Sequence, residues 1–172
     1  MTLPRLVAFD LDGTFWEKKR GKLRLLPDIE RIMEYLVTHR VHIAVCSNHN
    51  DEHEAEQFFR ETRIDINGRK KNLMSLVKSD CFVIRPGSKT SHFETVRQEA
   101  VVGFKEMLFF DDDLKNRNVR DVLGVKFIKV GKRGLDWRTF RKGMQSYDND
   151  ESSSDSDSSA SGKWYSSSSD DE

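Results

Sequence analysis

Four groups of polar residues, spread along the sequence, have the types needed to transfer a phosphoryl group. Two aspartates stand at Asp10 and Asp12, three more are consecutive at 111–113, and Ser47 and Lys89 lie between them. Clustered carboxylates repel one another unless a cation neutralises them, and carboxylate oxygens suit Mg²⁺. One carboxylate can attack phosphorus, and a second can move the proton of the leaving group. A hydroxyl and an ammonium can hold the other phosphoryl oxygens.

Each group also has an ordinary explanation. The Asp-x-Asp-Gly sequence that begins at Asp10 is common in turns, and strand-end serines often cap turns. Lys89 and the three aspartates could simply be solvated charges. The four groups occur in order, however, each after an apolar run that resembles a strand, and this arrangement favours a site.

The elements that must position these residues follow from the apolar pattern. Short apolar runs predict five buried strands, at 5–9, 41–46, 81–84, 107–110 and 125–130. Between and after them we expect helices. The first begins at 27–28 and has an apolar face through residue 37, and the others lie at 51–61, 90–102, 114–123 and 135–144. Residues 14–26 are expected to form a loop or small hairpin, and residues 67–72 a basic turn.

This alternation predicts an α/β fold, a Rossmannoid parallel sheet of about five strands with helices on both faces. Residues that follow the strands then meet at one edge of the sheet. Only 32 residues separate Thr14 from Ser47, and 41 separate Ser47 from Lys89. Neither gap has room for a large cap domain, so we expect an open site that admits bulky substrates.

The charge distribution divides the chain. Residues 146–172 hold eight acids, one lysine and twelve serines, whereas residues 1–145 carry a net charge of +7. We therefore expect a domain at 1–145 and a disordered, acidic, Ser/Asp-rich tail at 146–172. Five tail serines precede an acid by three residues, which suits an acidophilic kinase, although a solubilising tail is the simpler interpretation: Ser152, Ser154, Ser167, Ser168 and Ser169.

Several classes of protein are excluded by composition. No apolar run is long enough for a membrane span, and residues 1–9 are too short and too weakly apolar for a signal peptide. Cys46 and Cys81 lie in apolar runs, where buried free thiols are expected. We therefore expect a soluble intracellular protein, cytoplasmic or nuclear, without a membrane partner.

Three stretches of sequence resemble a known family. Phe9-Asp10-Leu11-Asp12-Gly13-Thr14 is similar to the first motif of the haloacid dehalogenase-like (HAD) superfamily, and Ser47, Lys89 and Asp111-Asp112 fit its later motifs. Residues 85–93 and 109–122 resemble the eukaryotic magnesium-dependent phosphatase family. The resemblance covers roughly residues 6–130.

The resemblance implies a Mg²⁺-dependent phosphatase that forms an aspartyl-phosphate. Asp10 would be the nucleophile and a Mg²⁺ ligand, and Asp12 the acid/base, with its backbone carbonyl on the metal. Asp112 would be the other metal ligand, and Asp111 would contact the metal ligands rather than the metal itself.

The resemblance also implies how the phosphomonoester substrate is held. Phosphate would be bound by Ser47, Lys89 and the backbone N–H groups of Leu11 and Asn48. Family members hydrolyse aryl phosphates, phosphotyrosine and some phosphorylated sugar amines. This chain differs where Asn48 stands in place of an arginine, where Gly13 replaces a larger residue, and where the loop at 15–25 is shorter. These differences affect the substrate rather than the chemistry.

Two rival functions remain. The basic loop at 18–24 would suit a nucleic-acid-end phosphatase, although no aromatic residues interleave it, so support for nucleic-acid binding is weak. A non-catalytic regulatory module with a vestigial site is the other rival, and the intact motifs argue against it. His49 and His53 have a spacing that metal sites use, but without a third ligand we expect both at the surface.

Overall fold

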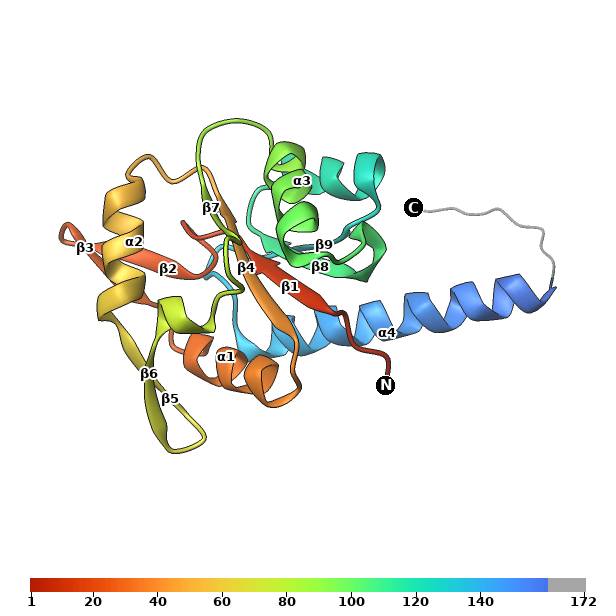
Figure 1. Ribbon diagram of the computed structural model, residues 1–172, viewed down its shortest axis with the longest axis horizontal. Helices are drawn as coiled ribbons and strands as arrows, with labels where there is room; N and C mark the ends of the chain where they lie inside the picture. Colours follow the sequence, from red (N-terminus) through yellow and green to blue (C-terminus); the bar gives the residue numbers. More distant parts are fainter. Residues whose placement is uncertain (161–172) are drawn as a thin grey trace.

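The computed structural model describes residues 1–160, with side chains through residue 152. Its centre is a parallel sheet in the order β7-β4-β1-β8-β9 (Figure 1). The strands are β1 (Leu6–Phe9), β4 (His42–Ser47), β7 (Phe82–Ile84), β8 (Met107–Asp111) and β9 (Lys126–Lys129). The predicted α/β fold with five parallel strands is confirmed.

The register of the sheet aligns the strand ends that carry the polar groups. Phe9 of the central strand β1 pairs with Val45 of β4 on one side and with Phe110 of β8 on the other. The residues that follow these three therefore leave the sheet at one edge, next to one another.

Helices cover both faces of the sheet, as expected (Figure 1). The helices are α1 (Ile29–Thr38), α2 (Glu52–Glu61), α3 (Lys89–Ala100) and α4 (Trp137–Ala160). Alternate residues of β1 point to opposite faces. Val7 and Phe9 share one core with apolar residues of α1, α2 and α4, and Leu6 and Ala8 share the other with those of α3.

Two hairpins fill the gaps in which a cap domain would be inserted. The first joins β2 (Trp16–Lys19) to β3 (Lys22–Leu25), and the second joins β5 (Arg63–Ile66) to β6 (Arg69–Asn72). The expected basic turn is thus the turn and second strand of a hairpin. Within the described residues neither gap holds a larger insertion, as predicted.

The remaining segments are short helical turns. These are η1 (Leu73–Leu76), η2 (Phe104–Glu106), η3 (Leu114–Arg117) and η4 (Val119–Leu123). The single helix expected at 114–123 is therefore two turns, a 3₁₀ turn followed by a π turn that ends at Gly124.

The C-terminal helix differs most from expectation. It continues through Ala160, past the expected domain end at residue 145. Tyr147 is buried, and its hydroxyl donates to the Lys105 carbonyl at 3.1 Å. Asp148 accepts from the backbone N–H of Thr2 at 2.7 Å, so contacts with the rest of the chain continue past residue 145. The disorder predicted for residues 161–172 lies outside the described residues.

Two further expectations concern the cysteines and membrane-spanning segments. Cys46 and Cys81 are buried free thiols, as predicted. Among the described helices, none is both long and apolar enough to cross a membrane.

Candidate active site

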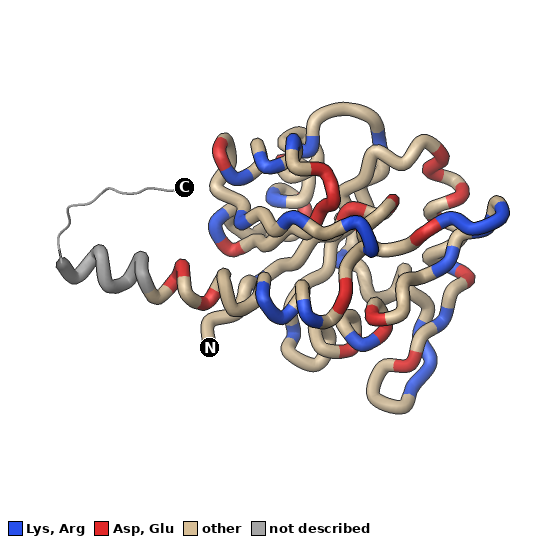
Figure 2. Tube along the Cα trace, turned by 180° about the vertical axis from the view of Figure 1, so that it is seen from behind, with Lys and Arg blue, Asp and Glu red and all other residues tan. Residues whose placement is uncertain are grey.

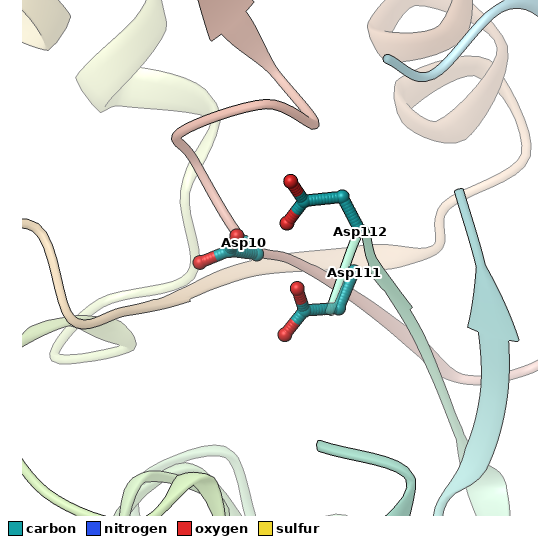
Figure 3. Close-up of side chains that lie close together, drawn as sticks. All are labelled: Asp10, Asp111 and Asp112. Atoms are coloured by element: carbon teal, nitrogen blue, oxygen red, sulfur yellow. The ribbon is translucent and has the colours of Figure 1, made fainter. Parts of the chain in front are cut away.

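Three carboxylates meet at the carboxyl edge of the sheet. Asp10 follows β1, Asp111 is the last residue of β8 and Asp112 follows it (Figure 3). One oxygen of each carboxylate lies within 4.8 Å of the others. A pocket of about 210 Å³ opens over them. Its lining comprises Asp10, Asp12, Ser47, Asn48, His49, Lys89, Asp111, Asp112, Asp113 and Asn116.

Lys89, the first residue of α3, supplies the positive charge of the site. Its ammonium donates to Asp10 Oδ1 at 3.1 Å and to Asp111 Oδ2 at 3.0 Å, and the side chain is 2% exposed. Asp111 also accepts from the Asn116 amide at 2.7 Å and from the Asp113 backbone N–H at 3.0 Å. Both Asp111 oxygens therefore have protein donors.

The charges of the site do not balance. Burial raises the pKa of Asp10 to about 8; Lys89 opposes this shift and Asp111 adds to it. Burial would lower the pKa of Lys89, but its two carboxylate partners outweigh burial and raise it, so Lys89 stays charged. Burial likewise raises the pKa of Asp112. Three carboxylates thus share one ammonium, and a divalent cation would supply the two missing positive charges. The all-oxygen donor set fits Mg²⁺.

The polar residues at the end of β4 also line the pocket. Ser47 is 1% exposed, and its Oγ accepts from the backbone N–H of His49 at 3.0 Å. The Asn48 side-chain nitrogen, in the orientation that satisfies both ends of the amide, donates to the carbonyls of Arg85 and Gly87 at 3.0 Å each. Asn48 therefore ties β4 to the loop before Lys89.

The turn after β1 positions Leu11 and Asp12. Leu11 buries its side chain in the core, and its carbonyl accepts from the backbone N–H groups of Thr14, Phe15 and Trp16. The Asp12 carboxylate is half exposed and lines the pocket, outside the three-carboxylate cluster.

The expectation that His49 lies at the surface is wrong. It is 8% exposed, and its ring lies between two carboxylates, with Nδ1 2.8 Å from Asp12 Oδ2 and Nε2 2.9 Å from Glu54 Oε1. Burial lowers the pKa of His49, but these hydrogen bonds outweigh it and raise the pKa. His53 is exposed, as expected. The sequence signal for His49 was its place two residues after Ser47, at a strand end.

Known proteins share this arrangement of strands and loops. The profile of a family described as Acid Phosphatase matches residues 17–150. The chain belongs to this family. The HAD-like hydrolase superfamily protein of Schizosaccharomyces pombe is 29% identical over 166 residues, which cover 81% of this chain and 93% of the relative. Magnesium-dependent phosphatase 1 of Homo sapiens is 29% identical over 171 residues, covering 84% and 88%. The expected place in the HAD superfamily, as a phosphatase, is confirmed.

Solved structures agree on the fold. The N-terminal part of a Bacteroides fragilis protein, which contains a phosphatase domain complexed with Mg, superposes with a TM-score of 0.62 at 24% identity. That match covers 81% of this chain and 39% of the other. A HAD family enzyme of Bacteroides thetaiotaomicron, in complex with magnesium and inorganic phosphate, gives a TM-score of 0.61 at 12% identity and covers 79% and 98%.

Proposed function

We propose that this acid phosphatase family member is a Mg²⁺-dependent phosphomonoesterase that works through an aspartyl-phosphate. The observation that carries the proposal is the cluster of Asp10, Asp111 and Asp112, which faces the single ammonium of Lys89. Asp10 and Asp112, with the backbone carbonyl of Asp12, would hold the ion. When bound, Mg²⁺ would offset charge on the phosphoryl oxygens and on the cluster.

Asp10 is the nucleophile in this proposal. Its carboxylate attacks phosphorus, the bond from phosphorus to the substrate oxygen breaks, and a phosphoryl group remains on Asp10. Lys89 keeps this carboxylate oriented and stabilises the charge that spreads over the phosphoryl oxygens. Ser47, with the N–H groups of Leu11 and Asn48, would bind the same oxygens.

Asp12 is the acid/base. It gives a proton to the departing oxygen of the substrate, then takes one from the water that attacks the phosphoryl group on Asp10. Phosphate leaves and both carboxylates return to their starting state. The place of the Asp12 carboxylate at the pocket, outside the cluster, supports a role in proton transfer.

The pocket favours a substrate that is recognised mainly by its phosphate. Its lining is polar, and no cap covers it within the described residues. We propose phosphotyrosine or another aryl phosphate, or a phosphorylated sugar amine, as the substrate class. The β2–β3 hairpin projects from the body of the protein and is rich in basic residues (Figure 2). Its Lys18 pairs with Glu54, which contacts His49 of the pocket, and this favours a second candidate, a nucleic-acid-end phosphatase.

Two predictions about the protein's surroundings remain proposals. An acidophilic kinase is proposed to act on the tail serines, of which Ser152 is exposed and the other four have no described side chains. A cytoplasmic or nuclear location is supported by the free thiols Cys46 and Cys81, because disulfides are rare in reducing compartments.

The decisive experiment compares the parent enzyme with Asp10→Asn on p-nitrophenyl phosphate, phosphopeptides, sugar phosphates and 3′-phosphorylated oligonucleotides. We expect the parent to show Mg²⁺-dependent turnover and to form a hydroxylamine-labile phosphoryl-enzyme. We expect Asp10→Asn to show neither. Turnover by Asp10→Asn would contradict the covalent mechanism. A parent that turns over none of the substrates would favour the alternative that the protein is a non-catalytic regulatory module.

A further inference from the structure

A short chain of polar contacts connects the pocket to the β2–β3 hairpin. It begins at Asp12, passes through the buried ring of His49 and continues to Glu54, in the first turn of α2. Glu54 in turn pairs with Lys18 of the hairpin at 3.1 Å. The role proposed above for Asp12 does not by itself require these partners.

The Asp12 carboxylate is held at both oxygens. Oδ1 accepts from the indole N–H of Trp16 at 2.8 Å, and Oδ2 lies 2.8 Å from His49 Nδ1. When Asp12 has given up its proton, its carboxylate only accepts hydrogen bonds, so in that state Nδ1 is the donor. Trp16 is fully buried and the His49 side chain is 5% exposed, so both donors are fixed by packing. A half-exposed aspartate would otherwise rotate freely.

His49 is itself held from three sides. Its backbone N–H donates to Ser47 Oγ, its Nε2 faces Glu54, and its ring makes a T-shaped contact with Trp16, with ring centres 5.4 Å apart. The orientation of the imidazole is therefore determined by the end of β4, by α2 and by the turn after Asp12.

We propose that His49 is a positioning residue for Asp12. Glu54 and Lys18 hold His49 in place, so the hairpin influences proton transfer through this series of side-chain contacts. The inference rests on the proposed acid/base role of Asp12. Proton transfer to a leaving oxygen requires the acid within hydrogen-bond reach of it, and small displacements reduce the rate strongly. His49 acts by keeping the carboxylate at the pocket, without touching the substrate.

Three His49 variants separate the two ring contacts. Asn places its amide nitrogen near the position of Nδ1 and keeps the donor to Asp12, Gln places its nitrogen near Nε2, and Ala removes both. The readout is kcat/KM for p-nitrophenyl phosphate and for an alkyl phosphate. This ratio reports the steps through loss of the leaving group, and p-nitrophenolate hardly needs a proton. His53→Ala is the matched surface control.

We expect His49→Ala and His49→Gln to lower kcat/KM for the alkyl phosphate by about 10- to 100-fold. This loss does not exceed the ~10²- to 10⁴-fold rate enhancement that a general acid typically contributes. The loss for p-nitrophenyl phosphate should stay below about threefold, because that substrate gains little from the acid. His49→Asn should keep most of the parent activity on both. Equal losses on the two substrates, or a His49→Asn as slow as His49→Ala, would overturn the proposal.

A second arm keeps the test decisive if His49→Ala does not fold. Glu54→Ala removes the outer contact, and Glu52→Ala, in the same helical turn and exposed, is its control. We expect a loss confined to the alkyl phosphate, about 3- to 10-fold, for Glu54→Ala alone. No such loss would overturn the link to the hairpin. Asp12→Asn shows whether the proposed function itself fails: without a leaving-group-dependent loss in that variant, the acid/base role is wrong and the positioning role with it.

Discussion

Gly13 makes room for the Asp112 carboxylate. A Cβ placed on Gly13 would lie 2.3 Å from Asp112 Oδ2, and the backbone φ of Gly13 is +77°. Gly13 was one of the positions at which the chain departs from the family it resembles. In this protein the small residue leaves space beside the turn after β1 for the carboxylate of Asp112, a proposed metal ligand.

Gly13→Ala should therefore weaken metal binding. The matched control is Gly21→Ala, because Gly21 has the same φ of +77° and open space around its Cβ position. Both variants should lose roughly 1–2 kcal/mol of stability from backbone strain. Only Gly13→Ala should raise the Mg²⁺ concentration for half-maximal activity, by about tenfold or more. An equal Mg²⁺ requirement in the two variants would show that the contact does not matter.

Metal removal tests the charge deficit of the carboxylate cluster. EDTA should abolish hydrolysis and Mg²⁺ restore it, while Ca²⁺ should support little, because its larger and looser coordination misplaces the nucleophile. Mg²⁺ should also raise the Tm of the parent protein, since a ligand that binds the native state stabilises it.

The Tm shift separates binding from catalysis. It should disappear in Asp112→Asn and persist in Asp80→Asn, which alters an exposed aspartate outside the pocket. Full activity in EDTA, or a Tm shift that Asp112→Asn retains, would contradict the metal assignment.

The C-terminal boundary can be tested by two truncations. Ending the chain after Met144 removes the buried ring of Tyr147, and we expect the free energy of unfolding to fall by about 2–4 kcal/mol. Ending it after Ser152 keeps that contact and should change stability by less than about 0.5 kcal/mol. Denaturant unfolding measures both, and Tyr147→Ala should reproduce most of the larger effect. Equal stability of the two truncated chains would restore the boundary at residue 145.

Much of the sheet could be predicted because its strands are buried on both faces. Buried parallel strands appear in the sequence as short continuous apolar runs, and the polar residues after each run predicted the candidate site. The strand β5 was missed because Arg63–Ile66 alternates exposed and buried residues over only four positions. The length of α4 was missed because its later residues are serines and acids, which composition assigns to a disordered tail.

His49 was missed for a different reason. Its burial depends on Trp16, which is distant in the sequence, and on Glu54, which comes close to the ring only once α2 has formed. Helical spacing with His53 suggested a metal pair, whereas the contact that matters joins His49 to Asp12 across the pocket edge. Contacts between side chains on different elements leave no periodic pattern in the sequence.

His92 should make the protein less stable in mild acid. Its ring is fully buried, Nε2 donates to the Arg85 carbonyl at 2.8 Å, and Nδ1 has no partner among the described residues. Burial, together with the charges of Lys89 and Arg85, lowers the pKa of His92 below its usual value. The unfolded chain therefore binds the proton more readily than the folded one.

The direction in which stability changes with pH follows from this difference in proton binding. Above a pH of about 6.5, the unfolded pKa, His92 is neutral in both states, and stability falls as the pH drops from there toward the lower folded pKa. His92→Gln can still donate to the Arg85 carbonyl but cannot titrate, so its unfolding free energy should fall less between pH 7.5 and pH 5 than that of the parent. The other histidines are present in both proteins and cancel in the difference. Parallel pH profiles in urea unfolding would show that His92 does not contribute.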